Sequence, residues 1–148
     1  RINIADRMTS RLVNIALSQY GIKEVPGVEN NPEIMKYFKV GNHTWVQGDE
    51  TAWCSAFVNW CADQLGFECS GELNARSWLN IGMRVDSIDN ADIAVLWRES
   101  PESWKGHVGI PIRETENHIW LLGGNQSNMV RISAYPKDRI LKYIKLWR

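Results

Sequence analysis

The sequence has 148 residues, enough for one domain with a single hydrophobic core, and 44% of the residues are hydrophobic. Its 17 basic residues balance its 17 acidic ones, so the chain lacks the clustered positive charge that nucleic-acid binding needs. The three cysteines have neither the number nor the spacing of a disulfide framework or a zinc site. No apolar run reaches the roughly 18 residues of a membrane span. We expect a single domain over residues 1–148, with no cofactor, no nucleic-acid partner and no membrane insertion.

Helices are predicted in the first part of the chain, where apolar residues recur at helical spacing between turn-forming segments. The expected ranges are residues 8–20, 32–38, a segment that follows Thr51 and runs to about Leu65, and residues 74–81. Thr9 or Ser10 suits the start of the first helix, and Gly66 ends the third. The acidic and hydroxyl side chains of residues 49–51 suit the N-terminus of that third helix.

Strands are predicted in the second part, where short apolar runs alternate with polar turns. The expected strands cover residues 93–97, 106–112, 118–122, 129–133 and 140–146. Helices followed by an antiparallel meander of about five strands indicate an α+β fold.

Cys54 is the first residue in the sequence that is typical of a catalytic site. It lies in the first turn of the third predicted helix, where the positive end of the helix dipole favours the thiolate. The N–H groups of the same turn can stabilise an oxyanion. The alternative for Cys54 is a buried structural cysteine, which is also the role expected for Cys61 and Cys69.

A thiolate nucleophile needs a general base, and His107 is the best placed of the three histidines. Gly106 and Gly109 surround it and leave room for a close approach. Strand alternation puts His107 on the face that lacks bulky side chains. The alternative is an exposed histidine at a strand edge.

The base in turn needs a group that holds its tautomer. Asn125 follows two glycines at the end of the next strand, and its amide oxygen can accept from the imidazole. Gln126, Glu114 and His118 compete for this place. An asparagine of a glycine-rich turn is the structural alternative for Asn125.

These segments together resemble the NlpC-type and CHAP-type branch of papain-like cysteine peptidases, and within it a small bacterial and phage subgroup. The motifs are DETAWCSAFVNWC (49–61), ARSWL (75–79), GHVG (106–109) and LGGNQSN (122–128). The resemblance implies a papain-like α+β core and cleavage of peptidoglycan amide bonds, in the stem peptide or at the glycan–peptide link. It implies Cys54 as nucleophile, His107 as base and Asn125 in the polar third place. Trp53 stands where NlpC-type proteins have aspartate, and no second histidine fills the third place, so the bond that is cleaved stays open.

The expected mechanism passes through a thioester that water hydrolyses. Asp49 and Glu50 are candidates to bind the amine of a diamino acid, with helix capping as the alternative. Trp53 and Trp78 are candidate walls of the cleft, with core packing as the alternative. Gln126 is a further expected substrate contact.

Two other functions fit parts of the sequence. The eight tryptophans are compatible with a non-catalytic wall-binding module that stacks on sugar rings. A cysteine acyl or amide transferase would use the same thioester. For the hydrolase we expect action in the periplasm or cell wall, as a phage lysin, a secreted antibacterial effector or the terminal domain of a larger enzyme. An effector would bring a cognate immunity or delivery protein as partner, and no signal segment is visible in the sequence.

Overall fold

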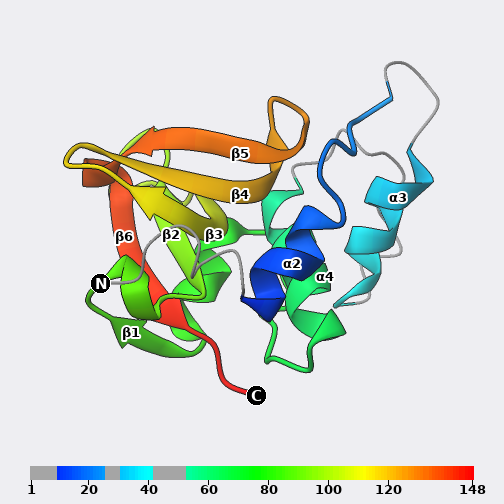
Figure 1. Cartoon of the computed structure of the whole chain (residues 1–148), viewed down its shortest axis with the longest axis horizontal. Coiled ribbons are helices and arrows are strands. Elements are labelled where there is room, and N and C mark those ends of the chain that lie inside the picture. Colours follow the sequence, from blue (N-terminus) through cyan, green and yellow to red (C-terminus); the bar gives the residue numbers. More distant parts are fainter. Residues whose placement is uncertain (1–9, 26–30, 42–52) are drawn as a thin grey trace.

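The computed structural model describes residues 10–25, 31–41 and 53–148. Figure 1 shows the α-helices gathered at one side of a sheet that forms the other half of the molecule. The α-helices are α2 (Arg11–Leu17), α3 (Pro32–Met35) and α4 (Cys54–Gln64). Four 3₁₀-helices, η1 (Lys36–Lys39), η2 (Ala75–Asn80), η3 (Ile88–Asn90) and η4 (Lys137–Arg139), complete the helical elements of the described residues. The predicted α+β class is confirmed.

The helix starts follow from local capping chemistry. Ser10 accepts a hydrogen bond from the backbone of Val13 at the start of α2, as one of the two predicted caps. Asn31 and Asn74 cap α3 and η2 in the same way. The range predicted as one helix over residues 32–38 is a short α-helix continued by a 3₁₀-turn.

The sheet has six strands in the order β1-β6-β2-β3-β4-β5, and every neighbouring pair is antiparallel. Its strands are β1 (Met83–Val85), β2 (Ile93–Trp97), β3 (Gly106–Glu114), β4 (His118–Gln126), β5 (Met129–Pro136) and β6 (Ile140–Lys145). The sequence did not predict β1, because three mostly exposed residues carry no alternation to recognise. It also ended β4 four residues early, at the pair Gly123 and Gly124, which continues the strand instead of turning.

The central strands β2, β3 and β4 are buried on both faces of the sheet. Helix α4 packs against β3 and β4, and the main core lies between them, around residues such as Phe57, Val108 and Leu122. A second cluster on the opposite face contains Leu96 and Leu121. Helix α4 is covered on more than one side, because every residue from Cys54 to Asn59 is buried.

A short N-terminal segment, residues 21–24, runs beside the start of β5. The Gly21 N–H donates to the Val130 carbonyl at 2.8 Å, and the Glu24 N–H donates to the Asn128 carbonyl at 2.9 Å. The side chain of Glu24 also accepts from the indole of Trp53 at 2.8 Å. This segment therefore ties the residue before α4 to the turn between β4 and β5. No helix within the described ranges has the length and apolar character that crossing a bilayer requires.

Candidate active site

Cys54 is the first residue of α4 and is 6% exposed. Trp53 precedes it as the N-cap, and its side chain makes no capping hydrogen bond. The nucleophile candidate therefore lies in a first turn whose N–H groups have no acceptor in the helix itself and none from the N-cap side chain. The residues predicted to cap this helix, Asp49, Glu50 and Thr51, lie outside the described residues.

Gly124 sets how closely α4 approaches the sheet. A Cβ atom at this position would lie 2.7 Å from the Phe57 Cβ and 2.7 Å from ring carbons of Trp53. Only glycine lets β4 pass this close to the first turn of the helix. This contact brings Cys54 to the edge of the sheet, at the beginning of β3.

His107 is the second residue of β3 and lies beside Cys54. It is 4% exposed, so the alternative of an exposed strand-edge histidine is wrong. Burial is the largest influence on the pKa of Cys54 and by itself raises it. The charge of His107 and its hydrogen bond to the sulfur act in the opposite direction, helped by the backbone of Val108 and the charge of Arg98. Together they lower the pKa of the Cys54 thiol below its ordinary value, so the pair favours thiolate.

The other two cysteines have raised thiol pKa values. Burial raises the pKa of Cys61 well above the ordinary value and that of Cys69 to about 11. Both stay protonated at neutral pH, as structural cysteines do.

Gln126 orients the imidazole of His107 through a hydrogen bond to Nε2. Its Oε1 lies 2.8 Å from His107 Nε2. Its Nε2 donates to the Leu121 carbonyl at 3.1 Å and to the Arg131 carbonyl at 2.6 Å. Two carbonyls can only accept, so the amide nitrogen must face them and the amide oxygen must face the histidine. His107 therefore donates from Nε2, which leaves Nδ1 as the nitrogen for the thiol.

A β-bulge explains why Gln126, and not Asn125, reaches the histidine. Three residue steps on β4, from Gly123 to Gln126, face only two on β5, so β4 contains one extra residue. Asn125 lies within the bulge and adopts the left-handed conformation, with φ 57°. Regular alternation would have turned Asn125 to the face of His107, but the bulge turns Gln126 there instead. The predicted hydrogen bond from the imidazole to Asn125 is thus corrected to one with Gln126.

Gly123 leaves the room that this amide needs. A Cβ at position 123 would lie 2.8 Å from the Gln126 Oε1. The other competitors for the third place, Glu114 and His118, lie at the far end of β3 and β4 from His107. Tyr135 completes the surroundings: its ring stacks on the imidazole at 5.1 Å, and its hydroxyl lies 3.2 Å from Nε2.

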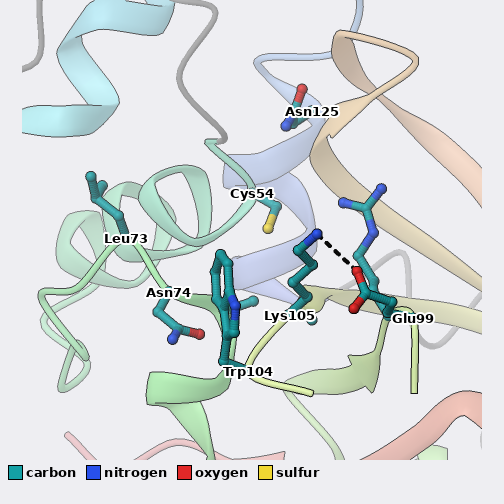
Figure 2. A pocket seen from close by; sticks show the side chains of 10 residues that line it. Cys54, Leu73, Asn74, Glu99, Trp104, Lys105 and Asn125 are labelled. Atoms are coloured by element: carbon teal, nitrogen blue, oxygen red, sulfur yellow. Dashed lines mark ion pairs between the residues drawn. The ribbon is translucent and has the colours of Figure 1, made fainter. Parts of the chain in front are cut away.

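A pocket of about 460 Å³ opens in front of the sulfur. Figure 2 shows Cys54 near its centre, with the sulfur directed toward the side that Trp104 and Lys105 line. Leu73 and Ala75 add apolar surface. Lys105 forms an ion pair with Glu99 at 2.8 Å, so these two rim charges compensate each other.

Arg76 fixes the loop that forms this rim. Its guanidinium donates to the carbonyls of Ser100, Pro101 and Lys105 at 2.9, 2.8 and 2.8 Å. Trp104 projects from the same loop and is 69% exposed. An exposed indole on an anchored loop can serve as a rigid wall for substrate.

A second cavity, of about 190 Å³, lies on the histidine side. His107, Gln126 and Tyr135 line it together with Arg139. Arg98 and Asn125 line both cavities, so the two adjoin there, with Cys54 lining the larger cavity and His107 the smaller one. The arrangement is a cleft with the sulfur toward one half and the imidazole toward the other.

The predicted substrate contacts are distributed differently. Trp53 and Trp78 are fully buried, and their indoles donate to Glu24 and to Ser55, so they pack in the core. Gln126 is 3% exposed and has each polar group of its amide engaged within the protein. Asp49 and Glu50 lie outside the described residues.

Sequence reasoning missed Trp104 and Arg98, which line the cleft from a polar loop. That loop has no periodicity, and its only signal was the pair Trp104-Lys105 just before GHVG. As for metals, the described ranges contain no group of three or more His, Cys, Asp or Glu side chains that could hold an ion.

Comparison with known protein families finds the CHAP domain, whose model matches residues 46–125. No curated protein matches the chain, and no solved structure does. The matched stretch is more than half of the chain and includes both Cys54 and His107. CHAP domains are generally peptidoglycan amidases or peptidases, which indicates activity on the cell wall at the level of the family. The chain belongs to the CHAP domain family.

Proposed function

We propose that this protein is a cysteine-dependent peptidoglycan hydrolase with Cys54 as nucleophile, His107 as general base and Gln126 as the group that orients the base. The observation that carries the proposal is the directed chain of contacts from Gln126 through His107 to Cys54. The donor and the acceptor of each hydrogen bond are determined. The two backbone carbonyls determine the orientation of the Gln126 amide, and the amide oxygen determines which imidazole nitrogen of His107 carries the proton. A merely structural histidine would not need a thiol of lowered pKa on its other side.

The proposed reaction begins with attack of the Cys54 thiolate on the amide carbonyl carbon. A C–S bond forms, and the carbonyl π electrons move to oxygen, where N–H groups of the first turn of α4 stabilise the charge. The tetrahedral intermediate collapses, the C–N bond breaks, and His107 gives its proton to the leaving nitrogen. A thioester and a free amine result.

Hydrolysis returns the site to its starting state. His107, now neutral at Nδ1, takes a proton from water as the water attacks the thioester carbon. The C–S bond breaks, the carboxylic acid leaves, and the thiolate and imidazolium are restored. Gln126 keeps the same imidazole orientation in both steps, because its own hydrogen bonds do not change.

The order of Cys54, His107 and an amide side chain along the chain also supports a papain-like core, with the nucleophile helix on an antiparallel sheet. We propose one domain over residues 1–148, because β5 and β6 complete the sheet that carries His107. Peptidoglycan lies outside the cytoplasm, so the activity requires secretion, delivery or phage release of the protein.

The test is digestion of purified peptidoglycan followed by mass spectrometry of the released muropeptides. The wild-type protein is expected to create new amine and carboxyl ends, and Cys54→Ala and His107→Ala are expected to create none. Cys69→Ser is the matched control: the Cys69 thiol donates to the Asn59 and Phe67 carbonyls, which a hydroxyl can also do. An unchanged muropeptide profile with folded wild-type protein would refute the proposal.

Digestion in heavy-oxygen water separates hydrolysis from amide transfer. Hydrolysis places one heavy oxygen atom in each new carboxyl group. Transfer to an amine places none, and that result would replace the hydrolase with a transferase that uses the same Cys54 and His107.

A further inference from the structure

The cavity on the histidine side has an unbalanced positive charge. Arg98 and Arg139 line it, and none of its lining residues in the described part of the chain is acidic. The larger pocket has a smaller excess of positive charge, because Arg98 lines it too but Lys105 is paired with Glu99 and the other walls are apolar or neutral. The two halves of the cleft therefore favour different ligand groups.

Neither arginine is neutralised by a carboxylate among the described residues. The Arg139 guanidinium lies over the Trp97 ring, 4.9 Å from its centroid, in a cation–π contact that restrains the arginine side chain. The Trp97 indole is itself held by a 3.3 Å hydrogen bond to the Asp138 carbonyl. A guanidinium held in this way is prepared to bind a carboxylate through two parallel hydrogen bonds.

The proposed chemistry decides which part of the substrate enters this cavity. The acyl carbon bonds to the Cys54 sulfur, which lines the larger pocket. The leaving nitrogen must take its proton from His107, which lines the smaller cavity. That proton is on Nδ1, which faces Cys54, so the leaving nitrogen lies where the two cavities adjoin at Arg98. With the acyl group in the larger pocket, the rest of the amine residue extends into the smaller cavity, beside Arg98 and Arg139.

We propose that the cavity lined by Arg98, Arg139 and Tyr135 binds a free carboxylate of the residue that supplies the leaving amine. The inference rests on the proposed hydrolase function and narrows its substrate. The preferred bond is one whose nitrogen belongs to an amino acid with its own carboxyl group free, on the carbon next to that nitrogen. The glycan–peptide link is excluded, because the carboxyl group of its amine residue is already in a peptide bond.

The first experiment identifies the amine residue released from purified peptidoglycan by mass spectrometry. New amines are expected on residues whose α-carboxyl group is free. Digestion that instead exposes amines on residues with a bonded carboxyl group overturns the inference and leaves the hydrolase function intact. No digestion at all refutes the function, and the inference falls with it.

The second experiment removes first the positive charge of Arg139 and then the negative charge of the substrate carboxylates. Arg139→Gln is expected to slow digestion about 10- to 100-fold, the effect of a lost hydrogen bond to a charged group. Peptidoglycan whose carboxylates have been converted to carboxamides is expected to slow the wild type by a similar factor and to leave Arg139→Gln unaffected. Arg113→Gln is the control, because Arg113 also stacks on an indole, that of Trp120 at 4.5 Å, but lines neither cavity.

Two results contradict the subsite. One is a wild type that digests amidated and native peptidoglycan at the same rate, a comparison that needs no variant to fold. The other is an Arg139→Gln protein, folded by circular dichroism, that keeps the wild-type preference for the native polymer. Arg139→Lys keeps the charge without the two-pronged geometry and is expected to fall between wild type and Arg139→Gln.

Discussion

The side-chain oxygen of Gln126 lies 2.8 Å from Nε2 of His107, and both residues are almost completely buried. The hydrogen bond has no competitor from solvent, and the amide cannot turn over without breaking two bonds to backbone carbonyls. The histidine is thus held in one tautomer by a neutral side chain.

Replacing Gln126 tests this arrangement. Gln126→Ala is expected to lower kcat at least about tenfold, equivalent to about 1.4 kcal/mol of barrier, because the imidazole loses its orientation. Gln126→Glu keeps the acceptor for His107 but places carboxylate oxygens against the carbonyls of Leu121 and Arg131. We expect Glu to destabilise the fold in urea more than Ala does. Wild-type kcat in a folded Gln126→Ala protein would contradict the role.

Asn125 is expected to act through its backbone. Asn125→Gly keeps access to the left-handed conformation at φ 57° and should retain activity. Asn125→Val should lose it, because a β-branched residue strongly disfavours that conformation and Gln126 would leave the histidine. Equal losses in both variants, measured as kcat at saturating substrate, would point to the Asn125 side chain instead.

The lowered pKa of Cys54 predicts selective alkylation. At neutral pH iodoacetamide should modify Cys54 in the native protein and spare Cys61 and Cys69, whose pKa values are raised. Peptide mapping by mass spectrometry measures this, and unfolding in urea should expose all three thiols.

The same reaction, followed against pH, tests the contribution of His107. The wild-type midpoint should lie below the ordinary pKa of a cysteine, and in His107→Ala it should rise above it, because burial then acts with far less opposition. Ionisation of Cys54 stabilises the fold above the unfolded-state pKa, and this contribution is lost as the pH falls through the lower folded-state value. An unchanged midpoint in His107→Ala would remove His107 from the pair.

Gly124→Ala is expected to destabilise the protein by about 1–3 kcal/mol, since the added methyl group overlaps Phe57 and Trp53. Urea unfolding measures this. Gly66→Ala is the comparison, because its Cβ would meet no atom within 4 Å and its cost would come from φ +73° alone. The kcat of Gly124→Ala should also fall, because α4 must move away from the sheet. Loss of stability with full kcat would show that the close contact does not position Cys54.

Arg76→Gln is expected to raise KM, with a smaller effect on kcat. The variant removes the hydrogen bonds that hold the rim loop, while Cys54, His107 and Gln126 stay in place. Trp104→Ala should reproduce the rise in KM without lowering the melting temperature, because the side chain is 69% exposed. A fall in kcat alone would show that the loop acts on the chemistry.

The sequence was sufficient to predict the elements that carry strong local signals. Apolar runs bounded by turn residues predicted the first residues of β2 to β6. Cys54 was predicted in the first turn of a helix, and it is the first residue of α4. Period-two alternation was also right about the face of His107. Each of these depends only on neighbouring residues.

Features that depend on distant parts of the chain could not be predicted. The bulge at Asn125 follows from pairing with β5, and one extra residue is enough to reverse which of two adjacent amides faces the histidine. Trp53 and Trp78 were ambiguous because burial of an indole depends on partners such as Glu24 and Ser55, which are far away in sequence. Arg98 and Arg139 come together only when β2 and β6 pair.

The short segment of residues 21–24, here called the strap, contacts both the start of α4, which carries the nucleophile, and the β4–β5 hairpin, which carries Gln126. It binds the residue before the nucleophile through Glu24 and Trp53, and the turn after the orienting amide through the carbonyl of Asn128. The stretch that matches the family model begins after this strap and stops one residue short of Gln126. Grafting residues 46–125 into another protein would therefore transfer a nucleophile and a base without the parts that keep them aligned. A transplant that preserves the geometry has to include the strap and the whole β4–β5 hairpin.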